Sequence, residues 1–147
     1  MTDVIAHAGL IARRSGGPWR GVLIEGASGS GKSDLALRAL DAGFRLVADD
    51  RVVLWADGGR LFGRAPEPLF GLIEVRGLDV MRVEALPLCE VALVVTLGKP
   101  ERIPEPAQVE RLGVLLPHLE LDPFETVAPV KLGRALAAFD AGVNRRI

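Results

Sequence analysis

Residues 26–33 read GASGSGKS, preceded by the apolar run GVLI at 21–24 with Glu25 and followed by DLALRAL. These eight residues fit the phosphate-binding pattern G-x-x-x-x-G-K-[ST], although an ordinary glycine-serine turn can have the same letters. The context separates the two readings, because a phosphate-binding loop needs a buried strand before it and a helix after it. The run at 21–26 predicts that strand, and the spacing of leucine and alanine over 33–43 predicts an amphipathic helix ended by Gly43. The sequence therefore predicts a P-loop.

The residue types of this loop explain how it would bind phosphate. Glycines let successive backbone N–H groups converge on phosphate oxygens, since a side chain would block the approach and the positive φ values that it requires. The Lys32 ammonium is expected to reach the β- and γ-phosphates, and the Ser33 hydroxyl to bind Mg²⁺. The N-terminus of the following helix adds partial positive charge. The predicted nucleotide-binding residues are Gly26, Ala27, Ser28, Gly29, Ser30, Gly31, Lys32 and Ser33.

The remaining sequence predicts an α/β chain with more strand than helix. Further strands are expected at 44–50, 51–55 and 90–97, and a terminal helix at 132–146. Closely spaced glycine and proline predict loop and short strand at 60–77, a surface loop at 98–108, and a strand or short turns within 109–124.

Length and composition limit the classes of protein that this chain can belong to. With 147 residues, 49% of them hydrophobic, residues 1–147 are expected to form a single domain around one core. A net charge of −1 gives no overall attraction to nucleic acid or to an anionic membrane. The longest apolar run, 91–97, is too short to span a bilayer, and the single cysteine excludes an intrachain disulfide. We expect a soluble cytoplasmic protein with neither nucleic acid nor membrane as a partner.

Two adjacent aspartates end the strand that follows the predicted P-loop helix. Asp49 follows Lys32 by seventeen residues (49 − 32), so that the acidic pair closes the strand FRLVADD. A P-loop kinase needs one carboxylate for the metal and another to receive the proton of the acceptor hydroxyl. Two adjacent carboxylates can divide these tasks. The alternative interpretation of the pair is an ordinary solvated turn after a strand.

The sequence resembles a known family over nearly its whole length. The segment GVLIEGASGSGKSDLALRALDAGFRLVADDRVVL at 21–54 resembles the P-loop core of bacterial HPr kinase/phosphorylase, and GLIEVRGLDVMRV at 71–83 resembles that family's second signature. VERLG at 109–113 and PVKLGRALAAFDAGVNRR at 129–146 are similar to its C-terminal region. The resemblance implies a P-loop kinase core of mixed sheet with flanking helices, related to phosphoenolpyruvate carboxykinase. It also implies a short form that lacks the family's N-terminal domain.

The resemblance implies roles for individual residues. Asp49 looks like the family's general base or acid, facing the serine hydroxyl of the protein substrate, while Asp50 and Glu74 look like metal-site carboxylates beside Ser33 and Lys32. His7 is similar to a histidine near the transferred phosphate. Arg134 resembles an arginine that approaches the phosphates, from the same or a neighbouring subunit. Without the resemblance, Glu74, His7 and Arg134 are equally compatible with solvated or structural positions.

The implied function is an ATP- and Mg²⁺-dependent protein serine kinase. Its partner would be HPr, the phosphocarrier of the sugar phosphotransferase system, in a trimer or hexamer of the kinase. Departures at Asp79, Leu132 and Ala135 favour kinase over phosphorylase activity, because the last two lie in a region linked to dephosphorylation. A small-molecule P-loop kinase and a non-catalytic nucleotide-sensing regulator remain as alternatives, and no residue stands out as a reader of the nucleotide base.

Overall fold

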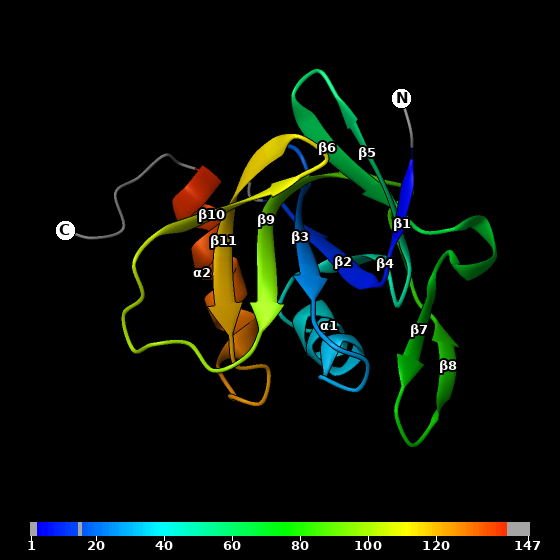
Figure 1. Cartoon of the computed structure of the whole chain (residues 1–147). Helices are drawn as coiled ribbons and strands as arrows, with labels where there is room; N and C mark the ends of the chain where they lie inside the picture. Colours follow the sequence, from blue (N-terminus) through cyan, green and yellow to red (C-terminus); the bar gives the residue numbers. More distant parts are fainter. Residues whose placement is uncertain (1–2, 15, 141–147) are drawn as a thin grey trace.

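The computed structural model of the chain describes residues 3–14 and 16–140. Figure 1 shows a curled sheet with two helices and a separate hairpin. The strands are β1 (Val4–Ala6), β2 (Ala8–Arg13), β3 (Arg20–Glu25), β4 (Arg45–Ala48), β5 (Val52–Asp57), β6 (Arg60–Arg64), β7 (Leu72–Val75), β8 (Asp79–Arg82), β9 (Cys89–Leu97), β10 (Ala107–Arg111) and β11 (Val114–Leu121). The helices are α1 (Lys32–Leu40), the single 3₁₀ turn η1 (Glu67–Leu69) and α2 (Ala128–Asp140).

The central strands of the sheet are parallel and its outer strands are antiparallel. Strands run in the order β1-β5-β6-β9-β3-β2-β4. Strand β11 pairs with the C-terminal half of β9, and β10 pairs with β11. Strands β3, β9 and β11 are mutually parallel, so that their carboxyl ends meet at the lower edge in Figure 1. Loops at this edge are therefore brought together from distant parts of the sequence, as is usual for binding sites in α/β sheets.

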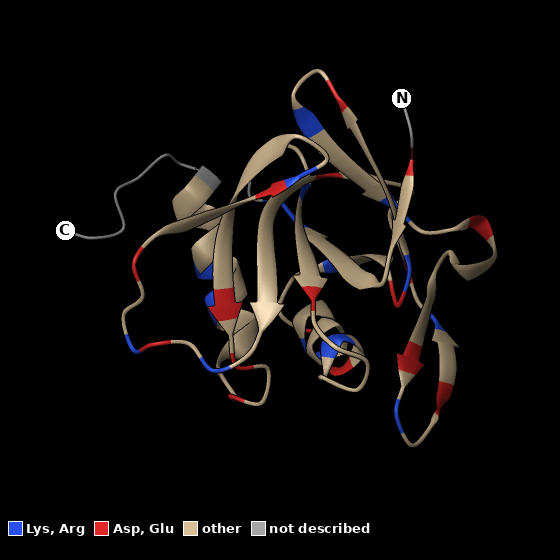
Figure 2. Ribbon diagram, in the orientation of Figure 1, with Lys and Arg blue, Asp and Glu red and all other residues tan. Residues whose placement is uncertain are grey.

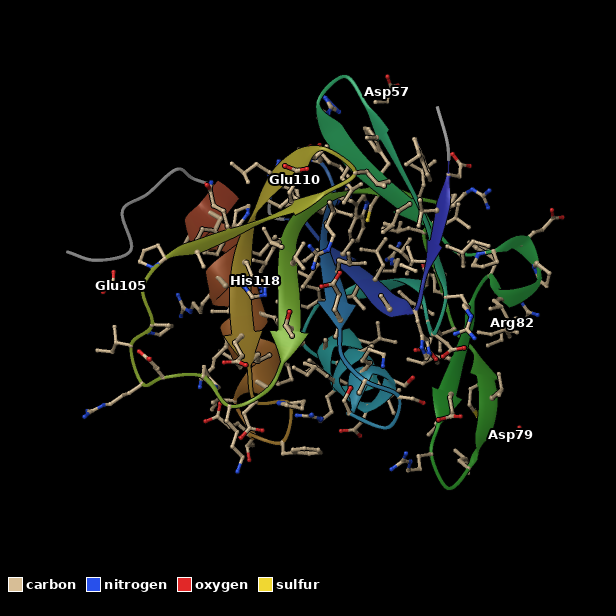
Figure 3. All side chains as sticks on the ribbon, in the orientation of Figure 1. Asp57, Asp79, Arg82, Glu105, Glu110 and His118 are labelled. Atoms are coloured by element: carbon tan, nitrogen blue, oxygen red, sulfur yellow. The ribbon has the colours of Figure 1, made fainter. Side chains whose placement is uncertain are left out.

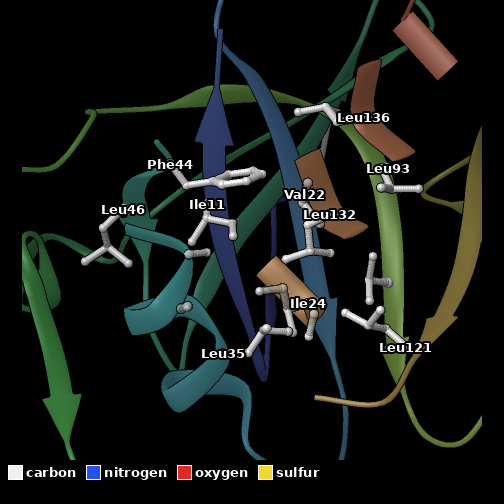
Figure 4. Close-up of a cluster of buried hydrophobic side chains, with 14 of the residues drawn as sticks. Ile11, Val22, Ile24, Leu35, Phe44, Leu46, Leu93, Leu121, Leu132 and Leu136 are labelled. Atoms are coloured by element: carbon white, nitrogen blue, oxygen red, sulfur yellow. The ribbon is translucent and has the colours of Figure 1, made fainter. Parts of the chain in front are cut away.

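Both helices pack against the same face of the sheet. Leu35 of α1 and Leu132 of α2 are fully buried with Ile11, Val22 and Ile24 of β2 and β3, as Figure 4 shows. The opposite face of β2 and β3 has its own buried cluster, which includes Leu10 and Leu23. That cluster is covered by strands of the same sheet, because β5, β6 and β11 contribute residues to it. The mixed α/β fold is confirmed, with the two helices on one face and sheet curling over the other.

Most of the predicted elements are confirmed, with three differences. Residues 4–13, for which no strand is predicted, form β1 and β2. The terminal helix begins at Ala128 rather than at residue 132, because Pro129 is accommodated in the first turn, where its missing N–H has no intrahelical partner to lose. Residues 141–146 of that prediction lie outside the described residues.

The third difference is the well-formed hairpin of β10 and β11, which begins at Ala107, within the predicted loop 98–108, and ends at Leu121. Its two-residue turn has positive φ at both Leu112 and Gly113, which matches the right-handed twist of the strands.

Candidate active site

The P-loop connects β3 to α1 at the edge where the parallel strands end. Beside it lies a pocket of about 610 Å³. Its walls come from the P-loop and α1, from the end of β4, from β7 and from the loop before α2. The pocket is lined by His7, Ser28, Gly29, Gly31, Lys32, Ser33, Asp34, Leu37, Asp50, Glu74, Val75, Arg76 and Phe124. The P-loop therefore meets three other predicted site residues in this pocket: His7, Asp50 and Glu74.

The backbone of the loop has the conformation that its glycines permit. Gly29 and Gly31 have φ values of +80° and +103°, which residues with a Cβ rarely adopt. Gly31 caps α1, and its carbonyl accepts the first helical hydrogen bond from the Leu35 N–H at 2.9 Å. The helix N-terminus consequently points into the pocket, where its free N–H groups favour an anion.

The Lys32 side chain is folded back onto the loop that carries it. Its Nζ donates to the carbonyl oxygens of Gly26 at 2.8 Å and Ala27 at 2.9 Å, and the residue is only 8% exposed. The two carbonyls satisfy an ammonium that would otherwise be buried without partners. The lysine predicted from the sequence is thus positioned at the phosphate site and already hydrogen-bonded.

Asp49 lies beneath the pocket rather than in its wall. The residue is 6% exposed, and its Oδ1 accepts a hydrogen bond of 2.7 Å from the Ser33 hydroxyl. Its Oδ2 accepts a hydrogen bond of 3.0 Å from the backbone N–H of Glu74. Both carboxylate oxygens are therefore engaged, and the carboxylate connects the P-loop serine to strand β7.

Asp50 faces the pocket and pairs with His7. The distance from Asp50 Oδ1 to His7 Nε2 is 2.8 Å, and Asp50 Oδ2 accepts from Arg51 at 3.2 Å. A positive φ of 69° turns the chain at Asp50, so that its side chain leaves β4 in a different direction from that of Asp49. Since the Asp50 side chain is 58% exposed, its carboxylate is accessible to an incoming substrate.

The oxygen atoms available for a metal fit Mg²⁺. Among the described residues no group of three or more His, Cys, Asp and Glu side chains is placed to hold a metal ion. Mg²⁺ in phosphoryl-transfer sites uses one or two protein carboxylates and completes its shell with water and substrate phosphates. Ser33 with Asp49 meets that requirement, and Glu74 lines the same pocket.

Two predicted catalytic residues do not line the pocket, because Asp49 lies beneath it and Arg134 lies elsewhere. Arg134 lines a separate cavity of about 460 Å³ beside α2, together with Arg13 and Arg14.

Two features near the site are not predicted from the sequence. Glu25, directly before the P-loop, makes a bidentate ion pair with Arg111 of β10 at 2.6 and 2.9 Å. The hydrogen bond that Arg111 donates to the Glu25 carboxylate raises the pKa of the Arg111 guanidinium, with a further contribution from the carboxylate charge. The second feature is Phe124, whose segment gives only a general signal for turns. Arg111 and Phe124 both lie far along the chain from the P-loop, so no local sequence pattern reveals that they come close to it.

No helix within the described part of the chain is long and apolar enough to cross a membrane.

The hairpin of β7 and β8 extends away from the main sheet, and Figure 3 shows Asp79 and Arg82 on it. In the view of Figure 2, acidic and basic positions are interspersed over the elements.

A P-loop, an acidic pair at the end of the next strand and a curled mixed sheet together define a P-loop domain of the kinase type. The sequence profile of the HPr Serine kinase C-terminal domain matches residues 19–139. The chain belongs to this family.

Similar proteins agree with this assignment. The HPr kinase/phosphorylase of Limosilactobacillus reuteri is 38% identical over 86% of this chain and 42% of its own length. That of Mycoplasmopsis pulmonis is 35% identical over 84% of this chain and 43% of its own. The solved structure of the Hpr(Ser) kinase/phosphatase from Coxiella burnetii has a TM-score of 0.79 at 25% identity, covering 95% of this chain and 97% of that one. The matches span less than half the length of these two curated relatives.

Proposed function

We propose that the chain is an ATP- and Mg²⁺-dependent protein serine kinase whose acceptor is HPr. The observation that carries the proposal is that Lys32 and Ser33 line the same pocket as the exposed pair of Asp50 and His7. Lys32 and Ser33 suit the phosphates of the donor. Asp50 and His7 suit an acceptor hydroxyl. Family membership supports the choice of a protein serine as that acceptor.

We propose roles for the two aspartates that differ from the expectation based on the sequence. Asp49 is buried with both oxygens engaged, which suits a carboxylate that orients Ser33 and contributes to the metal site. Asp50 is exposed and already hydrogen-bonded to an imidazole, which suits the group that receives a proton. The geometry thus favours Asp50 as general base and Asp49, with Ser33 and Glu74, on the metal side.

In the proposed step the serine oxygen of the acceptor forms a bond to the γ-phosphorus of ATP. The bond from that phosphorus to the β–γ bridging oxygen breaks, ADP leaves, and the hydroxyl proton passes to the Asp50 carboxylate. His7 positions that carboxylate through their 2.8 Å contact. Lys32 and the N-terminus of α1 neutralise charge on the phosphates, and Mg²⁺ supplies further charge neutralisation when bound.

The reverse reaction, a cytoplasmic location and an oligomer belong to the same proposal. In the dephosphorylation step an oxygen of inorganic phosphate forms a bond to the phosphorus of phosphoserine, the bond from that phosphorus to the serine oxygen breaks and pyrophosphate leaves, while a protonated Asp50 gives its proton to the serine oxygen. Because Arg134 lies in a separate cavity, the trimer or hexamer implied by the resemblance is what would give this residue access to a neighbour's phosphates.

The test is transfer from γ-labelled ATP to HPr and to an HPr variant that lacks its regulatory serine. We expect label on the first alone, and loss of labelling with Lys32→Ala. Asp50→Asn should lower transfer by at least about 100-fold, the lower range for a general base, while ATP binding persists. Asp57→Asn, at the exposed end of β5, is the matched control and should leave transfer unchanged.

Two outcomes would change the proposal in different ways. Full transfer by Asp50→Asn together with loss of transfer by Asp49→Asn would restore the assignment expected from the sequence. ATP binding without label on HPr would remove the proposed acceptor and leave a nucleotide-binding domain.

A further inference from the structure

An aromatic side chain stands exposed at the rim of the phosphate pocket. Phe124 lies in the connection between β11 and α2 and is 76% exposed, more than any other large apolar residue in the described part of the chain. It nevertheless lines the same pocket as Lys32 and Ser33. A phenyl ring this exposed contributes little to folding, because most of its burial free energy is not realised.

The backbone that carries this ring is held in place. The Arg38 guanidinium of α1 donates to the carbonyl oxygen of Pro123 and, at 3.3 Å, to that of Glu125. The Phe124 N–H donates to Asp122 Oδ1 at 2.9 Å. Hydrogen bonds on both sides of Phe124 thus fix its main chain to the helix that begins at the P-loop. The exposed ring is presented by an ordered segment.

The ring lies beside the P-loop. A Cβ built on Gly31 would lie 3.7 Å from Phe124 Cε1 and 3.6 Å from Pro123 Cγ. Phe124 therefore packs next to the last glycine of the loop. Leu37, just over one turn into that helix, lines the same pocket and adds a second apolar contact.

We propose that Phe124 stacks on the base of the nucleotide whose phosphates bind the P-loop, with Leu37 as an apolar contact. This inference rests on the nucleotide binding of the proposed function. A phenyl face offers no hydrogen-bond readout, and aromatic stacking accepts every base. The site should therefore hold ATP and GTP with affinities that differ only a few-fold.

The test measures Kd by calorimetry for Mg-ATP and for Mg-tripolyphosphate, which has the phosphates but no base. Loss of one aromatic stacking contact costs about 1–3 kcal/mol, so that Phe124→Ala should raise the Kd for ATP by about 5- to 150-fold. Its Kd for tripolyphosphate should stay within about twofold. Phe124→Tyr keeps the stacking face and should retain the affinity for ATP. Val127→Ala, on the same connection, is the matched control.

Each alternative result has a distinct meaning. An unchanged Kd for ATP in Phe124→Ala would overturn the stacking contact and leave the proposed function standing. An equal loss for ATP and tripolyphosphate would also overturn it, because the defect would then lie in the loop. If wild-type protein bound neither ligand, the phosphate site would fail together with this inference.

Discussion

Ser30 has a hydroxyl group buried inside the P-loop without a partner. Among the described residues no donor or acceptor lies within hydrogen-bond distance of its Oγ, and a buried hydroxyl of that kind costs about 1–3 kcal/mol. We expect Ser30→Ala to leave the melting temperature unchanged or to raise it. Its affinity for Mg-ATP should fall about fivefold, the effect of losing one ordinary hydrogen bond to phosphate of about 1 kcal/mol.

Thermal melts and calorimetry on the same Ser30→Ala preparation separate these two effects. A lower melting temperature would mean that the hydroxyl stabilises the empty loop. Unchanged ATP affinity would mean that it does not contact phosphate.

The sequence predicts individual site residues where they belong to one local pattern. Lys32 and Ser33 follow from eight consecutive letters, and the structure brings both to the pocket. Asp49 and Asp50 are adjacent, so the pattern cannot assign their roles; neighbouring residues leave a strand on opposite sides, and the positive φ at Asp50 turns it further. Phe124 lies 91 residues beyond Ser33 (124 − 33) and reaches the loop only through the folded sheet.

At the scale of elements, β3 depends on close approach to its neighbours. A Cβ at Gly21 would lie 2.6 Å from Cys89 Sγ, 2.9 Å from the Glu90 carbonyl oxygen and 3.1 Å from Leu10 Cδ1. Because one of these atoms belongs to the backbone of β9, the strands must separate to accept a methyl group. We expect Gly21→Ala to lower the free energy of unfolding by about 1–3 kcal/mol, measured by urea denaturation.

The control for this element is Gly17→Ala. A Cβ at Gly17 meets no atom within 4 Å and its φ is not positive, so the change in the free energy of unfolding should be near zero. Equal stability of the two variants would show that β3 and β9 can move apart at no measurable cost.

Elements were predictable where local composition favours one conformation. The apolar runs of β3 and β9 and the leucine and alanine spacing of α1 each indicate one conformation. The segment that precedes β2 mixes polar and apolar residues and indicates none. The hairpin of β10 and β11 contains Pro117 within a strand, a residue that ordinarily argues against one. Pairing with β9 and β10 provides the strand conformation there, and this pairing is a property of the sheet.

On the scale of the whole molecule, the curl of the sheet encloses a thiol. Burial raises the pKa of Cys89 to about 12, with a smaller contribution from the charge of Glu90. The thiol is therefore neutral in the folded protein at pH values where it ionises in the unfolded chain, above about 8.5. Its contribution to stability is complete below that pH and is lost as the pH rises toward 12.

Urea denaturation of wild type and Cys89→Ala at pH 7 to 10.5 tests this linkage. The difference in free energy of unfolding should be constant up to about pH 8.5 and then fall by about 1.4 kcal/mol per pH unit. A difference that stays flat to pH 10.5 would mean that the thiolate is tolerated in the fold.

The arrangement of the whole molecule is less predictable than its parts. The sequence patterns predict an α/β chain and the family resemblance implies a mixed sheet with flanking helices, as the structure has. Both helices lie on one face of the sheet because other strands already cover Leu10 and Leu23 on the opposite face. Such closure depends on sheet twist accumulated over many strands, which a linear pattern does not record.

The folded-back Lys32 makes phosphate binding a competition. Before a ligand arrives, its ammonium already has two carbonyl acceptors, from Gly26 and Ala27. The third N–H of the ammonium remains for a ligand, and exchanging a carbonyl for a ligand oxygen yields little net free energy. A lone chloride supplies one acceptor and is therefore at a disadvantage, whereas the closely spaced oxygens of a polyphosphate can bind the ammonium and engage the loop amides together. The loop thereby filters anions by the number of contacts they offer, even when salts greatly outnumber nucleotide.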